Sequence, residues 1–124
     1  MNIIIDTHIF LWAVSEPQKL SSLKTDIIKT PTNTIFVSSI TFIEIMIKVS
    51  IEKLKIDFDP IETAKESGFQ ILDFSAEDSL ALVDMPFHHK DPFDRMLISQ
   101  SINRDYYLMS DDGKFGYYDN LKLI

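Results

Sequence analysis

Residues 2–12 read Asn-Ile-Ile-Ile-Asp-Thr-His-Ile-Phe-Leu-Trp, and this stretch decides the fold. It opens with three consecutive isoleucines, a β-branched and continuously apolar run that suits a central parallel strand buried on both faces. Asp6 then interrupts the run, and we expect a short helix from Thr7 to about Val14. A strand, an acidic residue and a helix in this order indicate the start of an α/β unit.

Strands and helices continue to alternate along the rest of the chain. Apolar runs of strand length recur at residues 34–37, 69–72 and 106–109, with a short fifth at 121–123. Helices are expected at residues 21–29, 39–51, 60–67 and 75–83, and from residue 91 onward. Right-handed crossovers place helices on both faces of such a sheet. The expected fold class is therefore α/β, with a central, mainly parallel sheet of four to five strands.

Local signals mark the expected helices more closely. Ser38 or Ser39 is expected to cap the helix that follows the second strand. Four isoleucines recur along that helix and predict its apolar side: Ile40, Ile43, Ile47 and Ile51. Further on, Ser75-Ala76-Glu77-Asp78 is typical of a capping box and predicts a helix to about Val83.

The composition limits the kind of protein. The chain has 124 residues, which fits a single domain over residues 1–124, and it has no cysteine, which excludes a disulfide framework and a thiolate metal site. The apolar N-terminus is too short to span a bilayer and lacks the layout of a signal peptide, so we expect a soluble cytoplasmic protein without membrane contact. The net charge of −7 argues against broad electrostatic binding of nucleic acid.

Four acidic residues are predicted to meet at one edge of the sheet. Asp6 directly follows the first strand, and Asp112 lies three residues past the fourth. Asp94 opens the helix before the fourth strand, and Glu44 lies within the first two turns of the helix after the second. In open α/β sheets ligands bind outside the carboxyl ends of the strands, so this edge is the expected site.

Each of these acids also has an ordinary structural interpretation. An Asp between a strand and a helix is commonly an N-cap, and Glu44 can pair with Lys48 four residues on. However, apolar residues flank Glu44, and crowded carboxylates raise one another's pKa values unless a cation compensates their charge. All-oxygen ligand sets favour Mg²⁺ or Mn²⁺. The spacing alone therefore leaves helix caps and a metal site as open alternatives.

A metal site would also account for part of the net charge. Four carboxylates contribute −4 of the −7, and two bound divalent cations would add +4 at the same place. An acidic protein can therefore be locally cationic when it meets a nucleic acid.

The sequence resembles a known family over almost its whole length, from Ile3 to about Phe115. Four strings carry the resemblance, in order: IIIDTHIFLW from residue 3, SSITFIEIMIK from 38, HHKDPFDRMLISQS from 88 and LMSDDGKF from 108. Together they resemble the PIN domain, and most closely the VapC-type toxins of bacterial toxin–antitoxin pairs. DPFDRMLISQ is the most specific part.

The resemblance implies a three-layer, doubly wound α/β/α domain with endoribonuclease activity that uses Mg²⁺ or Mn²⁺. It implies Asp6, Glu44, Asp94 and Asp112 as metal-binding and catalytic acids, with Asp6 and Asp94 holding the main ion. It also implies RNA as the substrate, products with 5′-phosphate and 3′-hydroxyl ends, and inhibition of translation. A small antitoxin protein and a second copy of the chain in a homodimer are the implied partners.

The sequence departs from the family pattern near the third and fourth acids. The fourth acid belongs to a Thr-x-Asp pattern, but Ser110 replaces the threonine and Asp111 fills the middle position. Asp111 and Asp112 therefore both remain candidates for the fourth acid. Asp91 raises the same ambiguity beside Asp94, although its place next to a proline favours a helix cap.

Several other side chains are candidates for supporting roles. Thr7 and Ser110 can orient carboxylates or water, or simply cap helices. Arg95 can reach a phosphate, fix Asp94 or form a structural salt bridge.

The histidines and aromatic residues have less specific interpretations. A zinc site at the three histidines is disfavoured because they lack a paired ligand motif, and His88, His89 and Lys90 are expected to form a basic lip near the site. Trp12 and Phe10 are expected to be core or dimer contacts rather than platforms for base stacking.

Three other classes of protein share some of these features. A signalling receiver domain has similar length, a parallel sheet and Mg²⁺ binding, but it needs paired acids where Thr7 and His8 stand. An Asp-x-Asp phosphatase needs a second Asp at the position of His8. A PIN-like binding module without catalysis stays open, although the presence of all four acids weighs against it.

Overall fold

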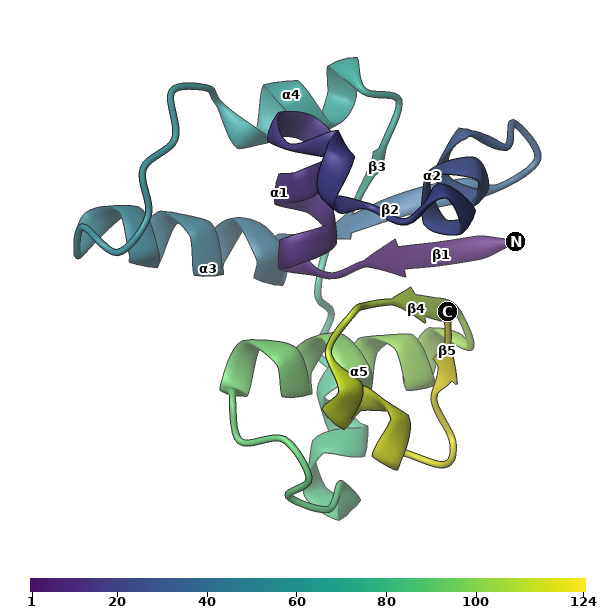
Figure 1. Ribbon diagram of the computed structural model, residues 1–124. Helices are drawn as coiled ribbons and strands as arrows, with labels where there is room; N and C mark the ends of the chain where they lie inside the picture. Colours follow the sequence, from purple (N-terminus) through teal and green to yellow (C-terminus); the bar gives the residue numbers. More distant parts are fainter.

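The centre of the molecule is a five-stranded sheet in which every pair of neighbouring strands is parallel (Figure 1). The computed structural model describes all residues from 1 to 124. The strands are β1 (Asn2–Ile5), β2 (Thr34–Ser38), β3 (Gln70–Leu72), β4 (Tyr107–Met109) and β5 (Lys122–Leu123), in the order β3-β2-β1-β4-β5. The prediction of an α/β fold with a central parallel sheet is confirmed.

Side-chain caps at the carboxyl ends of strands and loops start most of the helices. The helices are α1 (Thr7–Ser15), α2 (Ser22–Lys29), α3 (Ser39–Ser50), α4 (Pro60–Glu66) and α5 (Pro92–Arg104). Their N-caps, Asp6, Ser21, Ser38, Asp59 and Asp91, each accept a hydrogen bond from a backbone N–H of the first turn. Three short 3₁₀ segments complete the chain: η1 (Pro17–Lys19), η2 (Glu77–Asp84) and η3 (Gly113–Tyr117).

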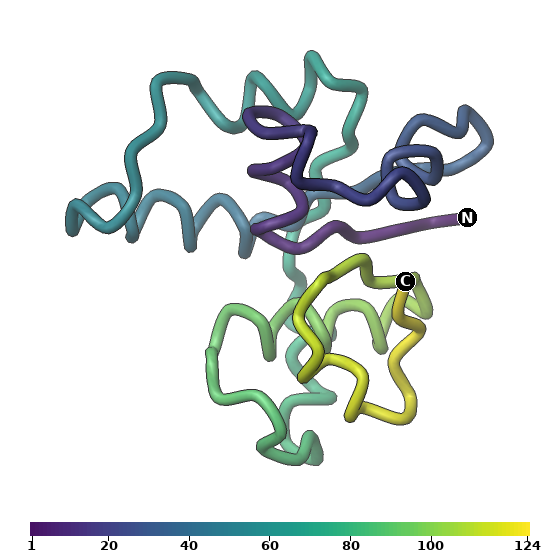
Figure 2. The backbone as a smooth tube through the Cα atoms, viewed as in Figure 1, coloured from purple at the N-terminus to yellow at the C-terminus, as the bar shows by residue number.

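The sheet separates two apolar cores. Ile3 and Ile5 of β1 point into the core under α1, α2 and α4, whereas Ile4 points into the core beneath α5. All three isoleucines are fully buried, which confirms that this strand is covered on both faces. The helices α1, α2 and α4 pack on one side of the sheet, and η2 and α5 pack on the other (Figure 2). The three-layer α/β/α arrangement is confirmed.

The predicted apolar side of α3 is wrong except for Ile40. Ile43, Ile47 and Ile51 keep 48%, 43% and 54% of their surface exposed, and the buried side carries Phe42 and Ile45 instead. The helix is apolar almost all the way round, so the periodicity of its isoleucines does not determine which side meets the sheet. An exposed apolar stripe therefore remains on α3.

The segment after β3 also differs from the prediction. The capping-box contacts form: the Ser75 N–H donates to the Asp78 carboxylate at 2.8 Å, and the Asp78 N–H donates to the Ser75 hydroxyl at 3.4 Å. However, the chain continues as the 3₁₀ segment η2 rather than as an α-helix. The Asp78 carboxylate is fully buried and accepts hydrogen bonds from Asn103 and Arg104, which ties the start of η2 to α5.

The strand order creates one place where a ligand can approach the sheet. The chain runs outward from β1 to β2 and β3 on one side, then crosses to β4 and β5 on the other. The helices that follow β1 and β4 therefore diverge at the carboxyl ends of these two strands, which is the switch point where open α/β sheets bind ligands. No helix combines the length and the apolar character needed to cross a bilayer.

Candidate acidic site

Asp6 lies at this switch point, between β1 and α1. Its backbone N–H donates to the Met109 carbonyl at 3.1 Å, which joins the end of β1 to the end of β4. Its carboxylate is nearly buried and accepts the Ile9 N–H at 2.9 Å, so Asp6 is the N-cap that sequence reasoning left open. Burial raises the pKa of Asp6, and hydrogen bonds from Ser110 and Ile9 only partly offset this. Capping by the Ile9 N–H uses only one of the two carboxylate oxygens.

Glu44 reaches the same edge from the second turn of α3. Its side chain is only 5% exposed, and its two oxygens accept hydrogen bonds from Thr7 and Lys48, both at 2.7 Å. The Thr7 hydroxyl lies 3.1 Å from that of Thr41 as well. The predicted pair of Glu44 with Lys48 therefore forms, but on a buried face rather than a solvated one.

Asp94 occupies the first turn of α5, where Asp91 is the N-cap. The Asp91 carboxylate accepts the Asp94 backbone N–H at 3.0 Å, which confirms that Asp91 caps the helix. The Asp94 side chain is thereby left to face the switch point. Burial, followed by the negative charges of Asp91, Glu44, Asp6 and Asp112, raises the pKa of Asp94 to about 8. The structure thus brings Asp6, Glu44 and Asp112 close enough to Asp94 for their charges to act on it.

The two neighbouring acids after β4 point in different directions. Asp111 pairs with Lys24 of α2 and leaves the cluster. Asp112 caps η3 by accepting the Lys114 N–H at 2.9 Å, and its own N–H donates to the Ser110 hydroxyl at 3.0 Å. Burial of Asp112 opposes ionisation, but hydrogen bonds from Lys114 and His89 outweigh it and lower its pKa. Of the two candidates, Asp112 is the one near Asp94, because one side chain contacts both of them.

That shared neighbour is His89, which sequence reasoning placed in a basic lip rather than in the site. The ring is buried, and its Nε2 lies 2.8 Å from Asp112 Oδ2 and 2.9 Å from Asp94 Oδ2. Its Nδ1 accepts the Asp91 N–H at 3.2 Å, so a neutral ring carries its proton on Nε2 and donates it to the acids. The only sequence signal is its position two residues before the helix cap Asp91.

Arg95 does not form the salt bridge considered for it from the sequence. Its buried guanidinium donates to the carbonyls of Met85, Pro86 and His89 at 3.0–3.2 Å and lies 4.1 Å from the centre of the Phe87 ring. It forms no ion pair with Asp94. Arg95 instead fixes the loop before α5, and with it the position of His89.

The donor set fits a divalent cation. His89, Asp94 and Asp112 each offer one ligand atom, and these atoms lie within 4.8 Å of one another. Burial and the negative charges of the neighbouring acids both raise the pKa of Asp94, and a bound cation would stabilise its ionised form. Carboxylate oxygens with at most one imidazole suit Mg²⁺ and Mn²⁺.

Comparison with known proteins identifies the same family as the resemblance. A family model described as PIN domain matches residues 3–121. The search of curated proteins finds no match.

Solved structures share the fold. VapBC2 from Rickettsia felis, bound to a DNA fragment from their promoter, has a TM-score of 0.76 at 22% identity, covering 100% of this chain and 98% of that one. DNA-bound VapBC from Salmonella typhimurium has a TM-score of 0.69 at 15% identity, covering 100% and 97%. VapBC-1 from nontypeable Haemophilus influenzae gives 0.65 at 14% identity, with the same coverage.

Proposed function

The chain belongs to the PIN-domain family, and from this premise we propose that it is a metal-dependent endoribonuclease, the toxin of a toxin–antitoxin pair that inhibits translation. One observation supports the proposal: Asp6, Glu44 and Asp112 lie near Asp94 at the switch point of the sheet, and burial together with the neighbouring acids raises the pKa of Asp94 to about 8. A fold keeps such repulsion where a cation binds. Residues 1–124 would form one PIN-like domain acting in the cytoplasm, where its RNA targets are.

The four acids would together bind Mg²⁺ or Mn²⁺. Asp6 and Asp94 would bind the main ion directly, and Glu44 and Asp112 would complete its surroundings. When bound, the ion lowers the pKa of a water molecule and stabilises negative charge on the phosphoryl oxygens. This chemistry suits hydrolysis of an RNA phosphodiester to 5′-phosphate and 3′-hydroxyl ends.

The neighbouring side chains position these carboxylates. Thr7 donates to one oxygen of Glu44 and Lys48 to the other, which fixes the carboxylate plane. His89 lies between Asp94 and Asp112, and the Ser110 hydroxyl accepts the Asp112 N–H, so both acids face the same point. The site therefore reaches its geometry before substrate arrives, which favours phosphoryl transfer by positioning.

An assay of RNA cleavage tests the proposal. The wild type should cleave total bacterial RNA with Mg²⁺ or Mn²⁺ and not with a chelator, and the new 5′ ends should carry phosphate. Asp94→Asn should abolish cleavage, because it removes the charge at the centre of the cluster. Asp105→Asn is the matched control, since this acid lies at the other end of α5, 79% exposed and paired with Lys122. Equal loss in both variants, or cleavage in the chelator, would contradict the proposal.

The proposal includes two protein partners. The structural neighbours are VapBC complexes, which supports a small antitoxin protein as the inhibitor. We also propose a homodimer in which the second copy covers the exposed stripe of α3, made of Ile43, Met46, Ile47 and Ile51. Contiguous apolar surface of this kind marks interaction sites on soluble domains.

A further inference from the structure

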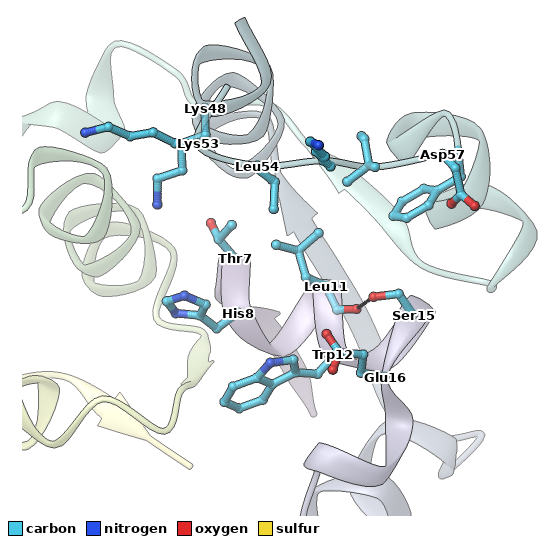
Figure 3. A pocket seen from close by; sticks show the side chains of 13 residues that line it. Thr7, His8, Leu11, Trp12, Ser15, Glu16, Lys48, Lys53, Leu54 and Asp57 are labelled. Carbon is cyan, nitrogen blue, oxygen red and sulfur yellow. Dashed lines mark hydrogen bonds between the residues drawn. The ribbon is translucent and has the colours of Figure 1, made fainter. Parts of the chain in front are cut away.

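A groove of about 460 Å³ opens beside the acidic site, between α1 and the segment 53–58 (Figure 3). His8 and Trp12 line it from α1, and Lys48, Lys53 and Lys55 line it from α3 and the segment that follows. Thr7 stands at the end of the groove nearest the acids. Figure 3 shows the two aromatic side chains on one wall and Lys48 and Lys53 on the opposite side.

The aromatic wall is a stacked pair. The ring centres of His8 and Trp12 lie 5.9 Å apart, with an angle of 27° between the planes. Trp12 packs on one side against the core, and His8 is exposed. Trp12 is thus a core contact, as the sequence suggested, and it lines the groove together with His8.

The opposite wall is basic in a protein of net charge −7. Three of the twelve Lys and Arg residues, Lys48, Lys53 and Lys55, line this one groove. Glu16 and Asp57 also line it, and Lys48 is paired with Glu44, so the two lysines without an acidic partner, Lys53 and Lys55, carry the basic character of this wall. A groove that combines aromatic faces with lysines has the composition of sites that bind single-stranded nucleic acid.

The groove and the acidic site share residues, so one polymer can occupy both. Thr7 and Lys48 line the groove and also hydrogen-bond to the Glu44 carboxylate. His8 follows Asp6 by two residues, at the start of the same helix. A strand whose phosphate reaches the acids would therefore continue between the aromatic pair and the lysines.

We propose that this groove binds the nucleotides next to the scissile phosphate of a single-stranded RNA, with one base stacked on the His8–Trp12 pair and the backbone phosphates against Lys48, Lys53 and Lys55. The inference rests on the proposed nuclease function and deepens it. Unstacked bases in single strands pack on aromatic and histidine rings, whereas a duplex hides its base faces. The substrate at this site is thus an unpaired segment, and sequence preference is weak at this position because every base has a face to stack.

Trp12 supplies a direct binding signal, because it is the only tryptophan in the chain. We would titrate the whole protein in a chelator, so that no cleavage occurs, with oligouridylate and oligoadenylate of about ten nucleotides. Both should quench Trp12 fluorescence to saturation, and a duplex of the same length should not. His8→Ala should weaken binding roughly tenfold or more, and His8→Phe, which keeps a flat ring, should restore it.

Charge-matched variants test the basic wall. Lys53→Ala should weaken binding and reduce its salt dependence, because one phosphate contact is lost. Lys65→Ala on α4, outside the groove, should behave as wild type. In cleavage assays with Mn²⁺, His8→Ala should raise KM about as much as it weakens binding and leave kcat within about threefold.

The outcomes separate this inference from the proposed function. Suppose that the wild type cleaves RNA and that His8→Ala and Lys53→Ala bind and cleave RNA equally well. The groove then does not bind RNA, but the proposed nuclease function is still supported. If an antitoxin peptide quenches Trp12 and single-stranded RNA does not, the groove is a protein-binding site and the inference is overturned. If the protein neither cleaves nor binds RNA, both the proposed nuclease function and the proposed RNA groove are contradicted.

Discussion

Asp94 is the residue on which the proposed chemistry depends most. It is flanked by Asp91 in its own helix and faces Asp6, Glu44 and Asp112 across the switch point. Its nearest positive candidate is the ring of His89, which it shares with Asp112. The ionised form of Asp94 is therefore costly in the protein without a cation, and this cost can be measured.

The stability of the metal-free protein should fall with rising pH because of Asp94. Its pKa is raised from 3.8 to about 8, so the stability is fully present below pH 3.8 and is lost as the pH rises through about 8. Asp94→Asn should lack this loss and melt higher than the wild type at alkaline pH, by about 4 °C for each kcal/mol of repulsion removed. Thermal melts across this pH range in a chelator provide the measurement. If the melting temperatures of the two proteins changed with pH in the same way, the raised pKa of Asp94 would be disproved.

The neighbouring acids Asp111 and Asp112 should differ sharply in their contribution to cleavage. Asp112→Asn removes the charge that faces His89 and should lower kcat roughly a hundredfold. Asp111→Asn only breaks an ion pair with Lys24 and should leave kcat within about threefold. Single-turnover cleavage by the two variants decides between them, and the reverse ranking would make Asp111 the fourth acid.

At this scale the sequence predicts which edge of the sheet the acids share, but not the side chains that surround them. Asp6 and Asp112 follow strands, and Asp94 opens a helix, so the edge they share can be worked out from chain order alone. His89 cannot be placed in this way, because its ring meets Asp112, a residue 23 positions away, only after α5 and η3 have packed. The partners of Arg95 cannot be predicted either, since they are backbone carbonyls that carry no sequence signature.

The contact between η2 and α5 shows how one buried carboxylate stabilises the packing of two elements. The fully buried Asp78 carboxylate accepts hydrogen bonds from Asn103 at 2.7 Å, Arg104 at 3.0 Å and the Ser75 N–H at 2.8 Å. Burial alone opposes ionisation of Asp78, but these bonds outweigh it and lower its pKa from 3.8 to about 2. The charged pair therefore stabilises the packing of η2 on α5.

Asp78→Asn should destabilise the protein by about 2 kcal/mol at neutral pH, the energy that corresponds to this pKa shift. Because the folded pKa is lowered, the contribution is present above pH 3.8 and is lost as the pH falls through about 2. Urea unfolding of both proteins at neutral pH and over this acidic range gives the test. A difference in unfolding free energy that does not shrink on acidification would contradict this account.

The helices and strands also show which features sequence patterns predict and which they do not. The strands, most helices and their caps follow from apolar runs and from Ser or Asp at the N-caps, which act locally. The buried side of α3 does not, because isoleucine, phenylalanine and methionine occur on all its sides and only contact with the sheet selects Phe42 and Ile45. The result is the exposed stripe that we assign to a partner.

At the scale of the whole molecule, that stripe predicts self-association. Ile47→Glu places a charge in its centre and should convert the proposed homodimer into a monomer. Ile61→Glu on α4 is the matched control, because Ile61 is 44% exposed, almost the same as Ile47 at 43%. Light scattering after size-exclusion chromatography measures the mass directly. A wild type that is monomeric at all concentrations, or a dimer that survives Ile47→Glu, would contradict the proposed interface.

The charge distribution follows from the same architecture. The acids gather at the switch point, and three lysines line the adjacent groove, so the positive charges of the groove lie beside the proposed metal site in a protein of net charge −7. Chain order and residue types predicted the first part. The groove was not predictable, because its two walls come from segments some forty residues apart.

The most direct test of the central claim compares Mn²⁺ binding with Mn²⁺-dependent RNA cleavage in the same preparations. Calorimetry should give one dissociation constant for the wild type and for Asp105→Asn, and half of the maximal cleavage rate should be reached at that Mn²⁺ concentration. Asp94→Asn should lose both the binding heat and the cleavage while remaining folded. RNA cleavage that persists in Asp94→Asn, or that reaches its full rate without bound metal, would contradict the account.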